Sequence, residues 1–105
     1  MEGVRLGRES NGQSLVVPLS TVSGLAIGES LTRMALVFPG PLAGNVTYSL
    51  QNPAVSGQGL VLNASSGPFS LDIQTHGDLV RRAWYAVADA GTPTVQIFFS
   101  DLPKE

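Results

Sequence analysis

The chain has no cysteine and little charge, and both shortages limit what it can do. Without cysteine it can form neither a disulfide framework nor a thiolate metal site or nucleophile. Only 13% of its 105 residues are charged, whereas an ordinary soluble domain has roughly 25%. Two hypotheses account for this shortage. Either other subunits cover much of the surface, because interface cores are depleted in Lys, Glu and Asp, or neutral polar side chains solvate it.

Long apolar runs and basic runs are missing as well. No segment approaches the roughly 20 apolar residues of a membrane span, and four charged residues between Glu2 and Glu9 interrupt any signal-peptide core. We therefore expect no secretion and no membrane partner. The net charge of −2 gives no electrostatic footprint for nucleic acid, so we expect no nucleic-acid partner either.

Candidates for catalysis are equally few. His76 is the only histidine, and it follows Asp72 by four residues and precedes Asp78 by two, so a carboxylate and an imidazole could meet. Gly77 follows at once, however, and the favoured interpretation is a turn with exposed polar side chains. No carboxylate pair is placed for glycosidase chemistry, and no phosphate-binding glycine loop is present. We expect no enzyme activity, no metal and no cofactor.

What the chain does contain is a series of short apolar segments bounded by turn residues. Apolar and polar residues alternate in residues 45–51 and again in 69–74, the period of a half-buried strand, and 59–63 is a shorter candidate. Residues 14–20 include Pro18, which cannot donate to a sheet ladder, so they predict an edge strand or a strand with a bulge. Residues 29–38 end in apolar side chains on both faces, as in a strand covered on two sides, and 21–28 are expected to be a loop.

The last third holds the longest apolar stretch. Residues 83–88 and 94–99 are separated by five turn-forming residues, which predicts a β-hairpin containing the only tryptophan. Residues 78–88 also show helical spacing, so a helix is the alternative there. A strand is favoured because every other element is β.

The spacing of these segments predicts the fold class. Some seven or eight short strands, with turn signals about every ten residues, indicate an all-β single domain, either an antiparallel β-sandwich or a jelly-roll-like barrel. We divide the chain into an N-terminal arm, residues 1–13, and a β-sandwich domain, residues 14–105. The arm is polar, contains glycine and shows no sustained period.

Aromatic residues and one basic doublet are the remaining candidate site groups. Trp84, Tyr85 and Tyr48 could stack on a sugar, but packing in a core or an interface is the favoured interpretation. In a strand, Arg81 and Arg82 would point to opposite faces. We expect ordinary solvated arginines, with an interfacial ion pair as the alternative.

Residues 84–95, WYAVADAGTPTV, resemble the closing strands of small all-β structural proteins of tailed-phage virions, including capsid cement or decoration proteins. The resemblance implies a non-enzymatic protein that is made in the host cytoplasm and located in the virion. It also implies a homo-oligomer, often a trimer, that binds the major capsid protein or another virion protein. The candidate interface residues are Val4, Arg5, Leu6, Arg8, Arg81, Trp84 and Tyr85.

The leading functional hypothesis is therefore a capsid cement or decoration protein that bridges capsid subunits and stabilises the shell by mass action. Residues 1–12 are the expected bridging arm. One alternative is a carbohydrate- or receptor-binding β-sandwich module, which requires exposed Trp or Tyr. Another is a structural subunit of a tail or baseplate.

Overall fold

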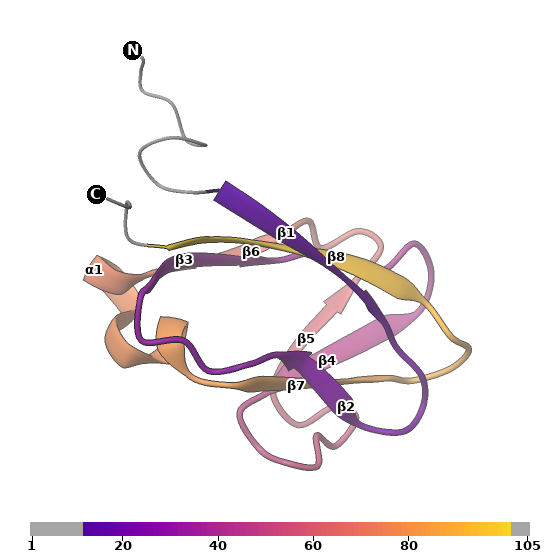
Figure 1. Cartoon of the computed structure of the whole chain (residues 1–105). Coiled ribbons are helices and arrows are strands. Elements are labelled where there is room, and N and C mark those ends of the chain that lie inside the picture. Colours follow the sequence, from indigo (N-terminus) through magenta and orange to yellow (C-terminus); the bar gives the residue numbers. More distant parts are fainter. Residues whose placement is uncertain (1–11, 102–105) are drawn as a thin grey trace.

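A computed structural model describes residues 12–101 and shows two four-stranded antiparallel sheets packed face to face (Figure 1). A short α-helix, α1 (Ile73–His76), and a 3-10 helix, η2 (Gly77–Arg81), lie between the sixth and seventh strands. The all-β single-domain prediction is confirmed. The strands are β1 (Gly12–Pro18), β2 (Gly24–Ile27), β3 (Arg33–Phe38), β4 (Asn45–Ser49), β5 (Leu60–Asn63), β6 (Phe69–Asp72), β7 (Trp84–Ala88) and β8 (Thr94–Asp101).

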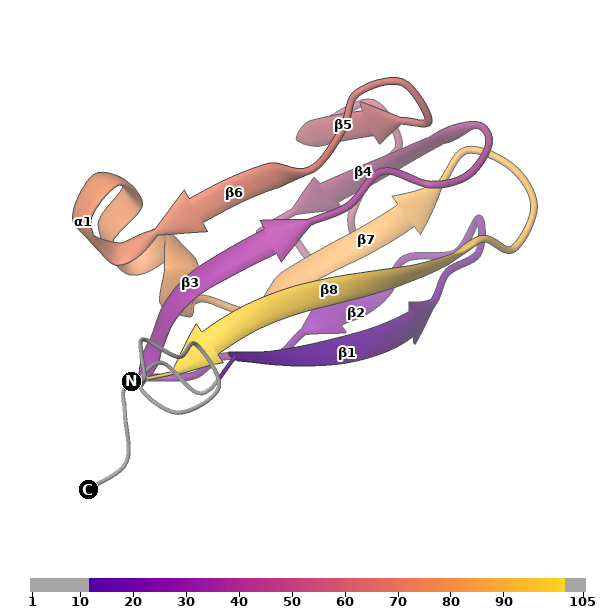
Figure 2. The same cartoon turned by 90° about the horizontal axis from the view of Figure 1, so that it is seen from above.

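The strand order is that of a jelly roll. The first sheet has the order β1-β8-β3-β6 and the second β2-β7-β4-β5. β1 pairs with β8, β2 with β7, β3 with β6 and β4 with β5, so the chain forms nested antiparallel pairs divided between two sheets. Seen from above, the first sheet lies in front of the second (Figure 2).

The predicted hairpin of the last third is wrong, although both of its strands exist. β7 pairs with β2 and β4, whereas β8 pairs with β1 and β3, so residues 89–93 cross from one sheet to the other. The Asp89 carboxylate accepts hydrogen bonds from the Asn45 backbone N–H (3.1 Å) and side-chain amide (3.2 Å). The Asp89 N–H donates to the Asn45 carbonyl (3.0 Å). These bonds hold the end of β7 beside β4 and away from β8.

Two other segments differ from the prediction. Residues 21–28, expected to be a loop, contain β2, whose pairing with β7 is interrupted by a bulge between Leu25 and Ile27. A strand this short and irregular leaves no alternating pattern in the sequence. Residues 78–88 are divided between η2 and β7, so the strand prediction holds only for the second half. Residues 73–74 belong to α1 and not to the preceding strand.

The core lies between the sheets and is centred on three aromatic rings. Phe38 stacks on Tyr48, with ring centroids 4.3 Å apart, and meets Trp84 edge-on at 5.0 Å. The Tyr48 hydroxyl donates to the Pro39 carbonyl, and the Trp84 indole N–H donates to the Leu79 carbonyl, each at 2.9 Å. Burial raises the pKa of Tyr48 far above its usual range. The interpretation of Trp84 and Tyr48 as packing residues is confirmed, because both are buried.

Arg33 is the largest fully buried side chain, at 2% exposed. The alternation of residues 33–38 places it with Ala35 and Val37 on one face, but a register shift between Arg33 and Ala35 turns it inward. Its Nε donates to the Val80 carbonyl (2.7 Å) and its Nη2 to the Arg82 carbonyl (2.9 Å). Burial lowers the pKa of the guanidinium, and the charge of Asp101 opposes that shift. Arg33 thus fixes the β6–β7 connection to the start of β3.

β1 is an edge strand, as Pro18 predicts. It begins at Gly12, so residues 12 and 13 of the predicted arm belong to the sandwich. The rest of the arm, with the candidate residues Val4, Arg5, Leu6 and Arg8, lies outside the described residues.

Candidate functional site

Charge is distributed unevenly along the sandwich. Of the eight charged residues among residues 12–101, seven lie where β3 begins, where β6 and β8 end, and where α1 and η2 connect the sheets (Figure 1). Asp89, at the opposite end, is the exception, and its carboxylate is bonded to Asn45. The seven are Glu29, Arg33, Asp72, Asp78, Arg81, Arg82 and Asp101. One end of the domain is therefore charged and the other is nearly free of charge.

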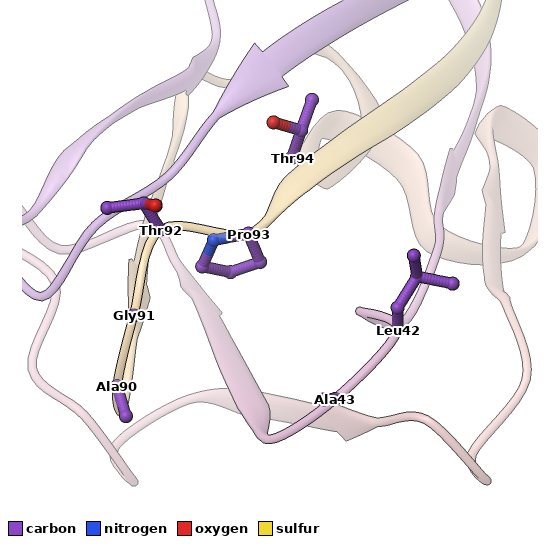
Figure 3. Close-up of a pocket in the computed structure, with 7 residues that line it drawn as sticks. All are labelled: Leu42, Ala43, Ala90, Gly91, Thr92, Pro93 and Thr94. Carbon is purple, nitrogen blue, oxygen red and sulfur yellow. The ribbon is translucent and has the colours of Figure 1, made fainter.

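Two hollows lie at the uncharged end. The smaller one, about 330 Å³, has Leu42 and Ala43 on one side and residues 90–94 on the other (Figure 3). The larger one, about 510 Å³, reaches from residues 39–42 to Phe98 of β8. Leu42 lines both hollows and is 96% exposed. We call the residues that line them the Leu42 surface: Val37, Pro39, Gly40, Pro41, Leu42, Ala43, Asn63, Ala64, Gly67, Pro68, Ala90, Gly91, Thr92, Pro93, Thr94 and Phe98.

The Leu42 surface continues onto the outer face of the first sheet. Phe98 is 49% exposed and stands in register between Ser14 of β1 and Val37 of β3. Val16, opposite Gln96, is exposed on β1. Around Phe98 this face carries neutral polar and apolar side chains, whereas the exposed Asp72, in register with Ala35, lies on it toward the charged end.

The chain itself covers part of the outer face of the second sheet, around Thr47 and Val87, while Leu25 and Val61 on the same face stay exposed. In the β4–β5 connection, the Gly57 N–H donates to the Thr47 hydroxyl (3.0 Å) and the Ala54 N–H donates to the Ser23 hydroxyl (2.8 Å). Thr47 and Val87 are buried as a result. Within residues 12–101, the β4–β5 connection therefore covers part of the outer face of the second sheet, whereas Val16 and Phe98 of the first sheet stay exposed.

The loop that carries Leu42 is held in place from two sides. The Tyr48 hydroxyl binds the Pro39 carbonyl, and Gly40 lies so close to the Asn63 carbonyl that a Cβ there would collide with the oxygen. On the other side, Asp89 and Asn45 join the two walls of the smaller hollow. A surface fixed in this way loses little conformational entropy on binding.

Gly40→Ala should lower the free energy of unfolding by about 1–3 kcal/mol, because the Asn63 backbone must move to admit the methyl group. Gly28→Ala is the matched control, since a Cβ at Gly28 would have nothing within 4 Å. Urea denaturation of both variants measures the difference. Equal stability of the two variants would contradict the close approach at Gly40.

Asp72 and His76 are brought together, but around the start of α1. The Asp72 carboxylate accepts the Thr75 N–H (2.7 Å), and His76 Nδ1 accepts the Asp72 N–H (3.1 Å). Both side chains thus serve as local backbone partners. Within the described part of the chain, no three acidic or histidine side chains are grouped so that they could hold a metal ion, and no helix there is long and apolar enough to cross a membrane.

The N-cap role of Asp72 predicts a pH dependence. The hydrogen bonds from the Thr75 backbone N–H and side chain lower the pKa of Asp72 in the folded state. The contribution of this carboxylate to the free energy of unfolding is therefore complete above its pKa in the unfolded chain. It is lost as the pH falls through its lower pKa in the folded state. Asp72→Ser keeps a cap that does not titrate. Between about pH 5 and pH 2 the wild type should lose more stability than this variant in urea unfolding; parallel losses would show that Asp72 does not contribute.

The described candidate interface residues lie away from the Leu42 surface. Arg81 donates to the Arg33 carbonyl (3.0 Å) and approaches the Met34 sulfur (3.8 Å). Trp84 is in the core, and Tyr85 is half-buried in β7 opposite Leu25. Neither Leu42 nor Phe98 is among the candidate residues predicted from the sequence. In PGPLAG, Leu42 follows Pro-Gly-Pro and precedes Ala-Gly, and a leucine among such turn-forming residues is a usable signal for an exposed apolar loop.

Comparison of the chain with protein-family models, with curated proteins and with solved structures found no match. The resemblance of residues 84–95 to virion proteins therefore stays a prediction.

Proposed function

We propose that this chain is a non-catalytic structural subunit of a virion, a capsid cement or decoration protein that docks on the capsid through the Leu42 surface. The observation that carries the proposal is the exposed, uncharged lining around Leu42 and Phe98 on a domain in which seven of the eight charged residues among residues 12–101 lie at the other end. Contiguous exposed apolar side chains mark binding surfaces for other macromolecules. The low charge of the whole sequence fits a surface that is covered in the assembly.

The jelly roll is compatible with this role but does not decide it. Such double-sheet folds occur in viral capsid proteins, lectins and cupins, and a fold shared by many proteins does not fix a function. The chemistry of the surface supports a protein partner. Its hollows are lined by apolar side chains, with polar side chains only at Asn63, Thr92 and Thr94.

The carbohydrate-binding alternative finds less support. This alternative requires an exposed Trp or Tyr ring and a dense set of hydrogen bonds, yet Trp84 and Tyr48 are buried and Tyr85 is half-buried. The exposed ring of Phe98 lies beside a hollow with one polar side chain, that of Asn63. A tail or baseplate subunit would use the same apolar surface on a different partner. Binding to capsids or to purified tails distinguishes these two partners.

The test is the heat stability of empty capsids assembled from the coat protein encoded in the same genome. A partner that binds the assembled shell and not the free subunits raises the temperature of shell disruption. We expect this rise to grow with protein concentration until the sites are filled. No binding to capsids, together with binding to purified tails, would overturn the capsid assignment.

A further inference from the structure

β1 leaves the longest free strand edge in the described part of the molecule. The edge strands β2, β5 and β6 have four residues each, whereas β1 has seven. β2 is further interrupted by a bulge, and β6 leads directly into α1. β1 carries no charged residue, and its one proline is its last residue. Natural proteins protect long edges with charge, proline or bulges, and this edge has little such protection.

The register with β8 shows which backbone groups of β1 have no partner within residues 12–101. The Leu19 N–H donates to the Pro93 carbonyl (2.8 Å), one step beyond the Pro18–Thr94 pair. Because bonded and non-bonded pairs alternate in an antiparallel ladder, Val17, Leu15 and Gln13 also bond to β8. The residues between them, Gly12, Ser14, Val16 and Pro18, direct their backbone N–H and C=O groups away from it. Pro18 lacks an N–H, but at this position the group would point away from β8, so the ladder with β8 loses no hydrogen bond.

We propose that β1 pairs antiparallel with β1 of a second copy across a two-fold axis at Leu15. The free groups at Gly12, Ser14, Val16 and Pro18 are symmetric about Leu15, so the strand overlaps its own copy over its full length. Ser14 of one copy then faces Val16 of the other, and each donates and accepts one hydrogen bond. The Gly12 N–H of each copy donates to the Pro18 carbonyl of the other. A two-fold interface of this kind is self-complementary, and no like charges meet in it.

The side chains fit the same arrangement. Leu15, 40% exposed beside the core, meets its copy at the axis, and Val16, 61% exposed, meets Ser14. The two first sheets join edge to edge, so their outer faces become continuous. This geometry gives a dimer, in contrast to the trimer that the family resemblance implies.

The dimer explains how a cement protein could bridge two capsid subunits, and this link to bridging rests on the proposed function. Bridging two capsid subunits requires two attachment points, and one Leu42 surface supplies one. A two-fold dimer carries two. The dimer itself is a property of the isolated chain and can be tested without any capsid.

The first test is the molar mass of the purified chain by light scattering after size exclusion. We expect about 22 kDa, twice the 11.0 kDa of the chain. Val16→Pro removes a free-edge N–H without touching the β8 ladder, so it should give a folded monomer. Val16→Thr, which keeps the N–H and the branched side chain, should stay dimeric. Near-ultraviolet circular dichroism of Trp84 checks that each variant is folded.

A second test does not depend on the proline variant folding. The wild-type chain has no cysteine, so Leu15→Cys introduces a single thiol at the axis. Residues directly opposite in a non-bonded antiparallel pair have Cα atoms about 4.5 Å apart, within the range that a disulfide spans. Mild oxidation should link two copies rapidly. Ser14→Cys faces Val16 of the other copy and should link far more slowly.

A monomeric wild type at tens of micromolar, or equal linking of the two cysteine variants, would overturn the β1 dimer. A trimer or larger ring that persists in Val16→Pro would overturn it as well. Loss of capsid binding with the dimer intact would count against the proposed function alone. A monomer that still binds capsids would remove the dimer and leave the proposed function standing.

Discussion

Arg33→Met should lower the free energy of unfolding by about 2–4 kcal/mol, because the Val80 and Arg82 carbonyls lose their donors inside the protein. Methionine fills much of the same volume and offers no hydrogen bond. Removing the buried charge recovers part of its desolvation cost, so the loss reflects mainly the two unpaired carbonyls. The β6–β7 connection should loosen first.

Arg82→Met is the matched control. The Arg82 side chain is exposed, and the Arg33 contact uses only its backbone carbonyl, so this variant should unfold like the wild type. Urea denaturation followed by Trp84 fluorescence measures both, since the indole N–H bonds to Leu79 in the same connection. Equal stability of Arg33→Met and Arg82→Met would show that the hydrogen bonds of the buried guanidinium do not stabilise the fold.

Leu42→Asp should weaken capsid binding by about 30-fold or more, the effect of removing an interface anchor worth at least about 2 kcal/mol. Leu42 is 96% exposed and lines both hollows, so a partner that fills them must enclose it. A carboxylate enclosed there would be desolvated without a cationic neighbour. Phe98→Asp should act in the same direction.

Leu31→Asp is the matched control, because it distinguishes loss of binding at the Leu42 surface from a general effect of adding a negative charge. Leu31 is 77% exposed and lies in the β2–β3 loop at the charged end. The same chemical change there should leave binding at the wild-type level. Co-sedimentation with empty capsids over a concentration series gives the affinities of the wild type and of the three variants. Equal weakening by Leu31→Asp and Leu42→Asp would place the interface elsewhere.

The sequence predicts strands better than it predicts their partners. Alternation in residues 45–51 and the apolar run of 94–99 locate β4 and β8 closely, because side chains on a half-buried strand must alternate. Pairing is decided by distant contacts. The short connection 89–93 favours a hairpin, and only the bonds between Asp89 and Asn45, 44 residues apart in sequence, show why it crosses between sheets.

The burial of Arg33 and the assembly of the Leu42 surface from distant loops could not be predicted, for related reasons. A one-residue register shift turns Arg33 into the core, and nothing in the local pattern encodes it. The Leu42 surface gathers residues from the β3–β4, β5–β6 and β7–β8 connections, which the jelly-roll order brings to one end. The shortage of charge predicts either a covered surface or a neutral solvated one. The topology adds that seven of the eight charged residues in 12–101 lie at the end away from the Leu42 surface.

The most direct test of the docking claim is hydrogen–deuterium exchange of the chain, free and bound to empty capsids. Binding through the Leu42 surface should protect backbone amides in residues 40–44 and 90–94, the exposed connections that line the two hollows. Amides of η2 and the β2–β3 loop at the charged end should exchange as in the free protein. Protection confined to the charged end, or none at the Leu42 surface in capsid-bound protein, would contradict the account.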